Sequence, residues 1–318
     1  MDVNPNGRHA GNGAGGDGEV ISRGVFVKVA VPAVAAAAVG AAVFVGATVD
    51  APSQEEKPAQ SAAADSSTKA EALVGDPSNP ATWRLPIEAY LPTKADTQLI
   101  SGARDTLIDA CMEKAGFAEW APAPDLPELG GKTLTDWRYG VHDAEQVASR
   151  GYHPDASEQK AYDAAMDAGA VDESGADDGT LRGCVAQADG EVPPAQEDGL
   201  AQQISGDAYR ASMENPDVLA AFAKWSSCMS GKGYSYKEPM EASDDPRFND
   251  PYQVTDLEIA TAKADVACRD QYDVEKTWFD AEVALQQAAI QKHQAELDGL
   301  KADNKSAVAK ASAFRDNG

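Results

Sequence analysis

The chain has 318 residues, of which 43% are hydrophobic and only 7% aromatic, so that alanine supplies much of its apolar content. Such a composition favours helices over sheets. The formal net charge is -25 at pH 7, and a surface this acidic repels phosphate backbones. We therefore expect a mainly α-helical protein that does not bind nucleic acid and that favours cations or basic partners.

One apolar segment stands near the N-terminus. No charged residue occurs from Val29 to Val49, and a run of this length spans the hydrocarbon core of a bilayer. Arg23 and Lys28 precede the run, whereas mostly acidic residues follow it, and this asymmetry keeps the N-terminus in the cytoplasm. We predict a disordered cytoplasmic tail over residues 1–23, a transmembrane signal-anchor helix over 24–49 and a disordered spacer over 50–81.

A cleaved signal peptide is the alternative interpretation of the same segment. Val45 and Ala47 suit the small-residue positions before a cut after Ala47. The length of the apolar run and its long polar lead-in favour the anchor. On the first interpretation the protein is a single-pass membrane protein with an extracellular C-terminal domain, and on the second it is secreted.

The pattern Cys-Met-x-x-x-Gly-aromatic occurs twice. Apolar residues at spacings of three and four precede each copy and predict a helix that leads into it. The glycine suits the left-handed position that ends a helix, and the aromatic residue after it can then pack on the methionine. The helix-ending residues are Met112, Gly116 and Phe117 after Cys111, and Met229, Gly233 and Tyr234 after Cys228.

A further cysteine follows each copy, and an even number of cysteines in a domain beyond the membrane predicts disulfides. We prefer the pairing of Cys111 with Cys184 and of Cys228 with Cys268 among the three connectivities. Each repeat then consists of a helix, an excursion and a returning cysteine. Four reduced thiols and a zinc site of four cysteines are the alternatives, and the absence of any Cys-x-x-Cys pair disfavours zinc.

The C-terminal part predicts one long helix. Thr255 and Glu258 form a capping box, and no glycine or proline follows before Gly299, which predicts a helix of about 43 residues. This helix either packs on the domain or forms a self-associating coiled coil through a weak heptad seam. The seam residues are Val283, Ile290, Leu297 and Leu300. We place a helical, disulfide-stapled domain at residues 82–274 and the long C-terminal helix at 275–318.

Few residues are candidates for a catalytic or metal-binding site. His142 and His153, beside Asp143 and Asp155, are the sole candidate pair for a metal or hydrolytic site. We favour ordinary surface or loop histidines instead, because the spacing places no third ligand. The chain from 169 to 199 reads as a loose acidic stretch, and its acids lack the ligand spacing of a calcium loop. These acids are Asp172, Glu173, Asp177 and Asp178. We therefore predict no catalytic, cofactor-binding or metal-binding residue.

Two further motifs lie between the copies of the repeated element. Trp137-Arg138-Tyr139-Gly140-Val141 is followed by Gly151-Tyr152-His153, and Trp225 precedes the second copy. This arrangement resembles a group of uncharacterised exported proteins of high-GC actinobacteria over residues 83–275. The resemblance implies a location in the cell envelope and a shared scaffold, and it implies no activity.

These observations together predict a membrane-tethered extracytoplasmic protein that acts as a non-enzymatic interaction or scaffold module of the cell envelope. Its partner would be an envelope protein or a cell-wall component, bound through the long C-terminal helix or the acidic face. The alternatives are an envelope hydrolase or a weak cation-binding protein with a site near His142 and His153.

Overall fold

The computed structural model describes residues 70–169, 172–197 and 199–317. The predicted tail 1–23, the predicted anchor 24–49 and most of the predicted spacer lie outside the described residues. Within the described part of the chain, no helix has both the length and the apolar character needed to cross a membrane. All described residues belong to one structural unit, Asp65–Gly318.

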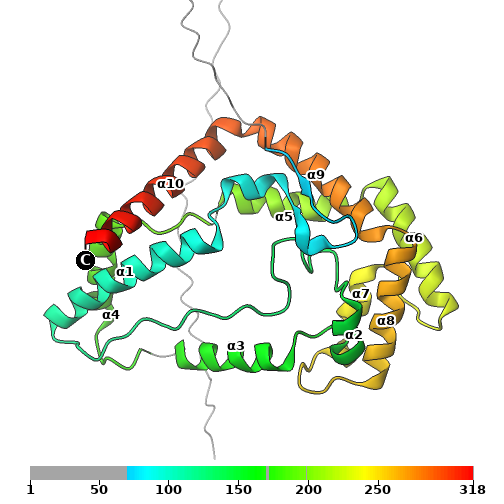
Figure 1. The fold of residues 1–318 in the computed structure, drawn as a ribbon, viewed down its shortest axis with the longest axis horizontal. Helices are drawn as coiled ribbons and strands as arrows, with labels where there is room; N and C mark the ends of the chain where they lie inside the picture. Colours follow the sequence, from blue (N-terminus) through cyan, green and yellow to red (C-terminus); the bar gives the residue numbers. More distant parts are fainter. Residues whose placement is uncertain (1–69, 170–171, 198, 318) are drawn as a thin grey trace, which may run out of the picture. The chain divides into compact units, whose positions relative to one another are not determined.

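The mainly α-helical fold predicted from the composition is confirmed, since the described residues form ten α-helices, three short 3₁₀ helices and a single two-stranded sheet (Figure 1). The helices are α1 (Lys94–Ala115), α2 (Ala144–Arg150), α3 (Ala156–Gly169), α4 (Asp178–Glu191), α5 (Leu200–Ser212), α6 (Pro216–Gly231), α7 (Pro239–Ser243), α8 (Asp256–Gln271), α9 (Val274–Lys292) and α10 (Gln294–Asn317). The 3₁₀ helices are η1 (Pro80–Thr82), η2 (Pro86–Tyr90) and η3 (Pro246–Phe248).

The folded domain begins earlier than predicted. Strand β1 (Leu73–Val74) pairs antiparallel with strand β2 (Trp83–Arg84). The indole Nε1 of Trp83 also donates a hydrogen bond to the carbonyl of Asp76 at 2.7 Å, and only 1% of Trp83 is exposed. Burial of this tryptophan orders the turn that precedes it, so the assignment of residues 70–81 to a disordered spacer was wrong.

The main core is rich in aromatic side chains and lies where α9 packs against α5 and α6, with α8 packed against α6. Its rings contact one another at centroid distances of 4.9 to 6.4 Å. A disulfide between Cys228 and Cys268 joins α6 to α8 at this core. We call this region the aromatic core, and its buried rings include Trp83, Tyr139, Phe222, Trp225, Trp278 and Phe279.

A second region consists of α1 and α4, which we call the α1–α4 arm. A disulfide between Cys111 and Cys184 joins the two helices. The buried side chains of the cluster around it are few, namely Ile108, Met112, Cys184 and Ala188. Helix α10 runs beside α1 (Figure 1) and adds another small cluster, at Ile100, Ala103, Val192, Ala307 and Ala311. Both disulfides follow the pairing preferred from the sequence.

The repeated element ends its helices as predicted. Gly116 and Gly233 both have a φ of 95°, in the left-handed region. The amide of Phe117 donates to the carbonyl of Met112 at 2.9 Å, and the amide of Tyr234 donates to that of Met229 at 2.9 Å. Both methionines are fully buried, and each aromatic residue packs against the cluster that holds its methionine.

The prediction of one long C-terminal helix was wrong, because this part of the chain forms the three helices α8, α9 and α10. Asp273 adopts a left-handed φ of 50° between α8 and α9, and His293 interrupts the chain again between α9 and α10. The two breaks redirect the chain, because α9 packs on α5 and α6 whereas α10 packs along α1. The predicted seam faces the domain itself, since Ile290 and Leu297 are buried in the main core while Val283 and Leu300 pack against it.

The described part of the acidic stretch 169–199 is also more ordered than predicted, because it contains α4. Asp177 is the N-cap of this helix, and its Oδ1 accepts the amides of Gly179 at 2.8 Å and Thr180 at 3.0 Å. Asp172 accepts the amide of Ser174 in a local turn. Hydrogen bonds to nearby backbone amides therefore account for Asp172 and Asp177.

Candidate functional site

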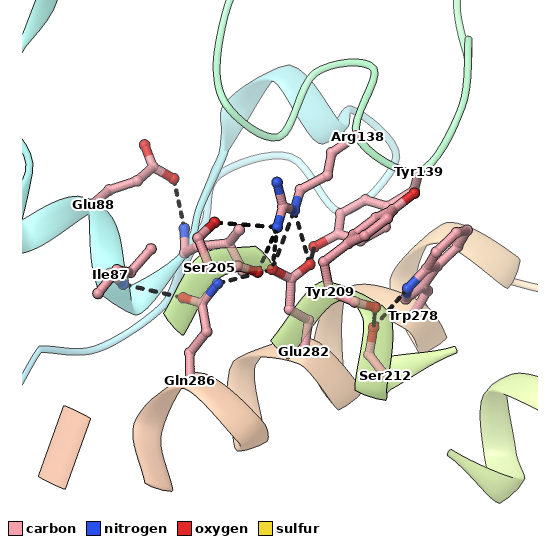
Figure 2. Close-up of polar contacts among 11 residues, drawn as sticks. Ile87, Glu88, Arg138, Tyr139, Ser205, Tyr209, Ser212, Trp278, Glu282 and Gln286 are labelled. Carbon is pink, nitrogen blue, oxygen red and sulfur yellow. Dashed lines mark hydrogen bonds and ion pairs between the residues drawn. The ribbon is translucent and has the colours of Figure 1, made fainter. Parts of the chain in front are cut away.

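The Trp137–Val141 motif holds a buried polar network together. Arg138 and Tyr139 reach from their loop to Glu282 on α9 (Figure 2). The Arg138 Nη2 lies 2.7 Å from Glu282 Oε1, and the Tyr139 hydroxyl donates to Oε2 at 2.8 Å. The Arg138 guanidinium also lies 4.7 Å from the ring centroid of Tyr209.

This network leaves no carboxylate oxygen of Glu282 free. Gln286 Nε2 donates to Oε1 at 2.8 Å, and the Gln286 amide oxygen accepts the backbone amide of Ile87 at 3.1 Å. Burial and the adjacent Glu282 carboxylate raise the pKa of Tyr139 far above its ordinary value, so this phenol stays a hydrogen-bond donor. A buried ion pair with saturated partners is a structural element rather than a reactive one.

Helical spacing could have revealed this network from the sequence. Glu282 and Gln286 recur every four residues after Trp278 and before Ile290, which places two polar side chains on the apolar face of α9. Both are fully buried. A polar residue on such a face requires a buried partner, and Arg138 in the motif was the available cation.

A second buried ion pair lies inside α8. Arg269 Nε is 2.7 Å from Asp265 Oδ1, its Nη2 is 2.9 Å from Oδ2, and its Nη1 donates to the carbonyl of Tyr139. Trp225 Nε1 donates to the same Asp265 at 2.8 Å. A Cβ at position 140 would collide with the Arg269 guanidinium, so Gly140 is required for this close approach.

The Gly151–His153 motif surrounds Glu258, which is fully buried on α8. The Tyr152 amide donates to Glu258 Oε1 at 3.1 Å, and His153 Nε2 lies 3.5 Å from the same oxygen. A Cβ on Gly151 would approach that oxygen within 2.4 Å. The Tyr152 hydroxyl, His153 Nε2 and Glu258 Oε2 form no hydrogen bond. Both sequence motifs, Trp137–Val141 and Gly151–His153, therefore pack around buried carboxylates.

His142 lies in a different environment, a cavity of about 370 Å³ at the corner between α8 and α9. Its Nε2 lies 2.7 Å from Asp136 Oδ1, and both side chains are mostly buried. His153 does not line this cavity. The structure thus does not bring the two candidate histidines together in one pocket. The titratable and charged residues that line it are His142, Arg269, Asp270, Asp273, Glu275 and Lys276.

The cavity holds one strongly perturbed acid. Burial raises the pKa of Glu275 to about 8, although Arg269 opposes the shift, and the nearby Asp270 and Asp265 add to it. Burial also raises the pKa of Asp270, against the lowering effects of His142 and Arg269. A desolvated acid in a cavity is a functional-site candidate.

The remaining candidate acids have local structural roles. Asp143 accepts the amides of Glu145 and Gln146 as the N-cap of α2, and Asp155 accepts the amide of Ser157. Over the ranges that the structure describes, no group of three or more His, Cys, Asp or Glu side chains is placed to hold a metal ion. The cavity at the α8–α9 corner is therefore the candidate functional site. No protein-family model, curated protein or solved structure matches the chain.

Proposed function

We propose that this chain is a membrane-tethered extracytoplasmic protein whose helical domain is a non-enzymatic interaction module of the cell envelope. The observation that carries the proposal is the pair of formed disulfides, Cys111–Cys184 and Cys228–Cys268. Disulfides persist in oxidising compartments and are rare in the cytosol. The apolar segment 24–49, read as an anchor, would supply the tether; cleavage after Ala47 would instead release the domain.

The use of the buried charged residues supports an interaction role. Glu282 and Asp265 are saturated by Arg138 and Arg269, as described above. His142 already pairs with Asp136. Charged side chains that hold a scaffold rigid are not available for proton transfer, whereas a rigid acidic surface suits recognition of a basic partner.

An envelope hydrolase that uses both His142 and His153 is the weaker alternative. Acid and base groups must converge on one substrate. His142 opens into the α8–α9 cavity, whereas His153 lies against the buried Glu258 and does not line that cavity. A hydrolytic site would have to use His142 without the second histidine.

Photo-crosslinking in cells tests the interaction role. A crosslinking amino acid would replace Asp303, which is exposed on α10, and in a control would replace Met166, which is 48% exposed on α3. We expect a discrete adduct of the full chain from position 303, and a weaker one or none from 166. The proposal fails if position 303 yields no adduct above that control.

A further inference from the structure

A groove of about 350 Å³ runs between α5 and α9, which pack side by side (Figure 1). Ile204 and Ala208 form its floor, since both line it and each is only 5% exposed. Leu285 lines its α9 side and is 37% exposed. Apolar side chains thus meet solvent along the groove, and they are Leu200, Ile204, Ala208, Ala211, Leu285 and Ala289.

The cationic side chains of the groove lie at one end of it. Tyr209, near the end of α5, stacks on Trp278, near the start of α9, so the two helices run antiparallel. The first residue of α5, Leu200, therefore lies toward the end of α9, where Lys292 and His293 complete the lining. The groove thus has an apolar length and one polar end that carries a lysine.

Lys292 supplies the uncompensated charge of the groove. The acid that lines it, Asp207, forms an ion pair with Arg210 and lies about 10 Å along the helix axis from the first residue of α5. His293 Nδ1 lies 3.4 Å from Glu296 Oε2. Among the described residues, the Lys292 ammonium group has no such partner. A chain whose formal net charge is -25 therefore presents an apolar groove with a free positive charge at its end.

We infer that the α5–α9 groove binds a single-chain amphiphile with an anionic headgroup, whose acyl chain covers the floor and whose headgroup contacts Lys292. Burial of methylene groups supplies the affinity, and the ammonium group donates charge-assisted hydrogen bonds to the headgroup. The stretch of α5 from Leu200 to Ala211 is about 16 Å long, enough for the extended chain of a medium-length fatty acid. This inference goes beyond the proposed interaction function and depends on different residues.

Photolabelling of the full chain in isolated membranes tests the groove. The probe is decanoate with a diazirine near the end of its acyl chain, and the labelled peptides are mapped by mass spectrometry. We expect the label on the residues of α5 or α9 that line the groove. Unlabelled decanoate should compete about fifteenfold better than octanoate, since each buried methylene contributes roughly fourfold.

The headgroup preference is tested with decylamine, which has the same chain and the opposite charge. Decanoate should compete at least about tenfold better than decylamine, because only the anion pairs with the lysine. Equal competition by the two compounds, or label confined to other segments of the chain, would overturn the inference.

Two variants test the two parts of the site. Lys292→Glu reverses the charge at an exposed position and should lower the labelling at least about fivefold. Its control, Lys305→Glu, changes an exposed lysine on α10 and should lower it less than about twofold. Leu285→Asp places a charge on the apolar length and should lower the labelling at least about tenfold, whereas the control Leu219→Asp lies outside the groove on α6 and is 49% exposed. Labelling of Lys292→Glu or Leu285→Asp equal to that of the unmodified chain would contradict the site.

Competition with decyl phosphate separates the two sources of the anionic oxygens. Stronger competition by decanoate identifies a free fatty acid, and stronger competition by decyl phosphate identifies a single-chain phospholipid. A groove that stays unlabelled, but whose position 285 crosslinks to another protein, would identify a protein helix as the occupant and overturn the inference. These outcomes are independent of the crosslinking result from α10.

Discussion

The aromatic core and the α1–α4 arm contain the same helix ending and one disulfide each, but they differ in how much they bury. Around Cys228–Cys268 the core buries several large rings and two ion pairs. The cluster around Cys111–Cys184 contains four buried hydrophobic side chains, one of which is a cysteine of the bridge itself. The same sequence element thus ends a helix beside a large hydrophobic core in one region and beside a small one in the other.

The difference shows where a covalent bond matters most. Apolar burial contributes roughly 25 cal/mol per Å², so a region with few buried side chains depends more on its crosslink. Stability is not uniform across a structure, and a thin region can open while the rest stays folded. We therefore expect the arm to unfold locally when weakened and the aromatic core to unfold only with the whole domain.

The largest effect is expected from Glu282→Ala in the aromatic core. Removal of the carboxylate leaves Arg138 without its ion-pair partner and takes acceptors from Tyr139 and Gln286, which should cost about 3–5 kcal/mol of unfolding free energy. Denaturant unfolding measures this loss. The control Glu296→Ala removes an exposed carboxylate on α10 and should change stability by less than about 0.5 kcal/mol. A small effect at Glu282 would show that the pair does not hold the core.

Removal of either disulfide should lower the free energy of unfolding by a similar amount. The two removals should, however, destabilise different regions. The bridges close loops of 73 and 40 residues, for which chain entropy predicts a loss of about 4 kcal/mol each. In the Cys111→Ser/Cys184→Ser variant, amides of the arm should exchange with solvent much faster while those of α9 stay protected. In Cys228→Ser/Cys268→Ser, protection should fall throughout the domain. Equal patterns of hydrogen exchange in the two variants would contradict the comparison.

A matched pair of glycine substitutions tests the difference between the arm and the aromatic core, with a smaller expected loss of unfolding free energy. Gly116 and Gly233 share a φ of 95°, and a Cβ at either position would meet nothing within 4 Å. Replacement by alanine should therefore cost about 1 kcal/mol of backbone strain at each. Hydrogen exchange should detect Gly116→Ala in the arm alone and Gly233→Ala in global unfolding. Clearly unequal backbone costs at the two sites would show that packing differs at the caps.

Stability should also depend on pH through the cavity beside the aromatic core. The folded pKa of Glu275 is raised to about 8, so the folded state holds more protons than the unfolded state between the ordinary glutamate pKa and pH 8. Stability contributed by this group is therefore lost as pH rises through that window. Melting temperatures from pH 5 to pH 8.5 should fall less for Glu275→Gln than for the unmodified chain. Parallel curves for the two proteins would show that Glu275 does not titrate in this range.

The sequence was informative where one local rule decides the structure. The glycine after each Cys-Met element predicted the helix ends, and apolar spacing predicted the helices before them. The break at Asp273 was not visible, because no glycine or proline marks it and tertiary packing turns the chain there. Helix α4 was missed because its polar composition conceals an N-cap at Asp177.

The candidate site was less predictable than the fold. His142 was recognised as a rare titratable residue, but its partner Asp136 and the acid Glu275 come from separate segments. Only the turn between α8 and α9 brings Glu275 beside Asp270 and His142. His153 was grouped with His142 by proximity in sequence, whereas its neighbour in space is Glu258, more than a hundred residues later.

The central claim is that this is an exported domain held together by two disulfides. The most direct test is whether its four cysteines are oxidised in cells. The full chain would be quenched with an alkylating agent, digested without reductant and analysed by mass spectrometry. We predict linked peptides that join Cys111 to Cys184 and Cys228 to Cys268, with no alkylated cysteine. Alkylated free cysteines in the mature protein, or a peptide that joins Cys111 to Cys228, would contradict both the proposed location and the two-region fold.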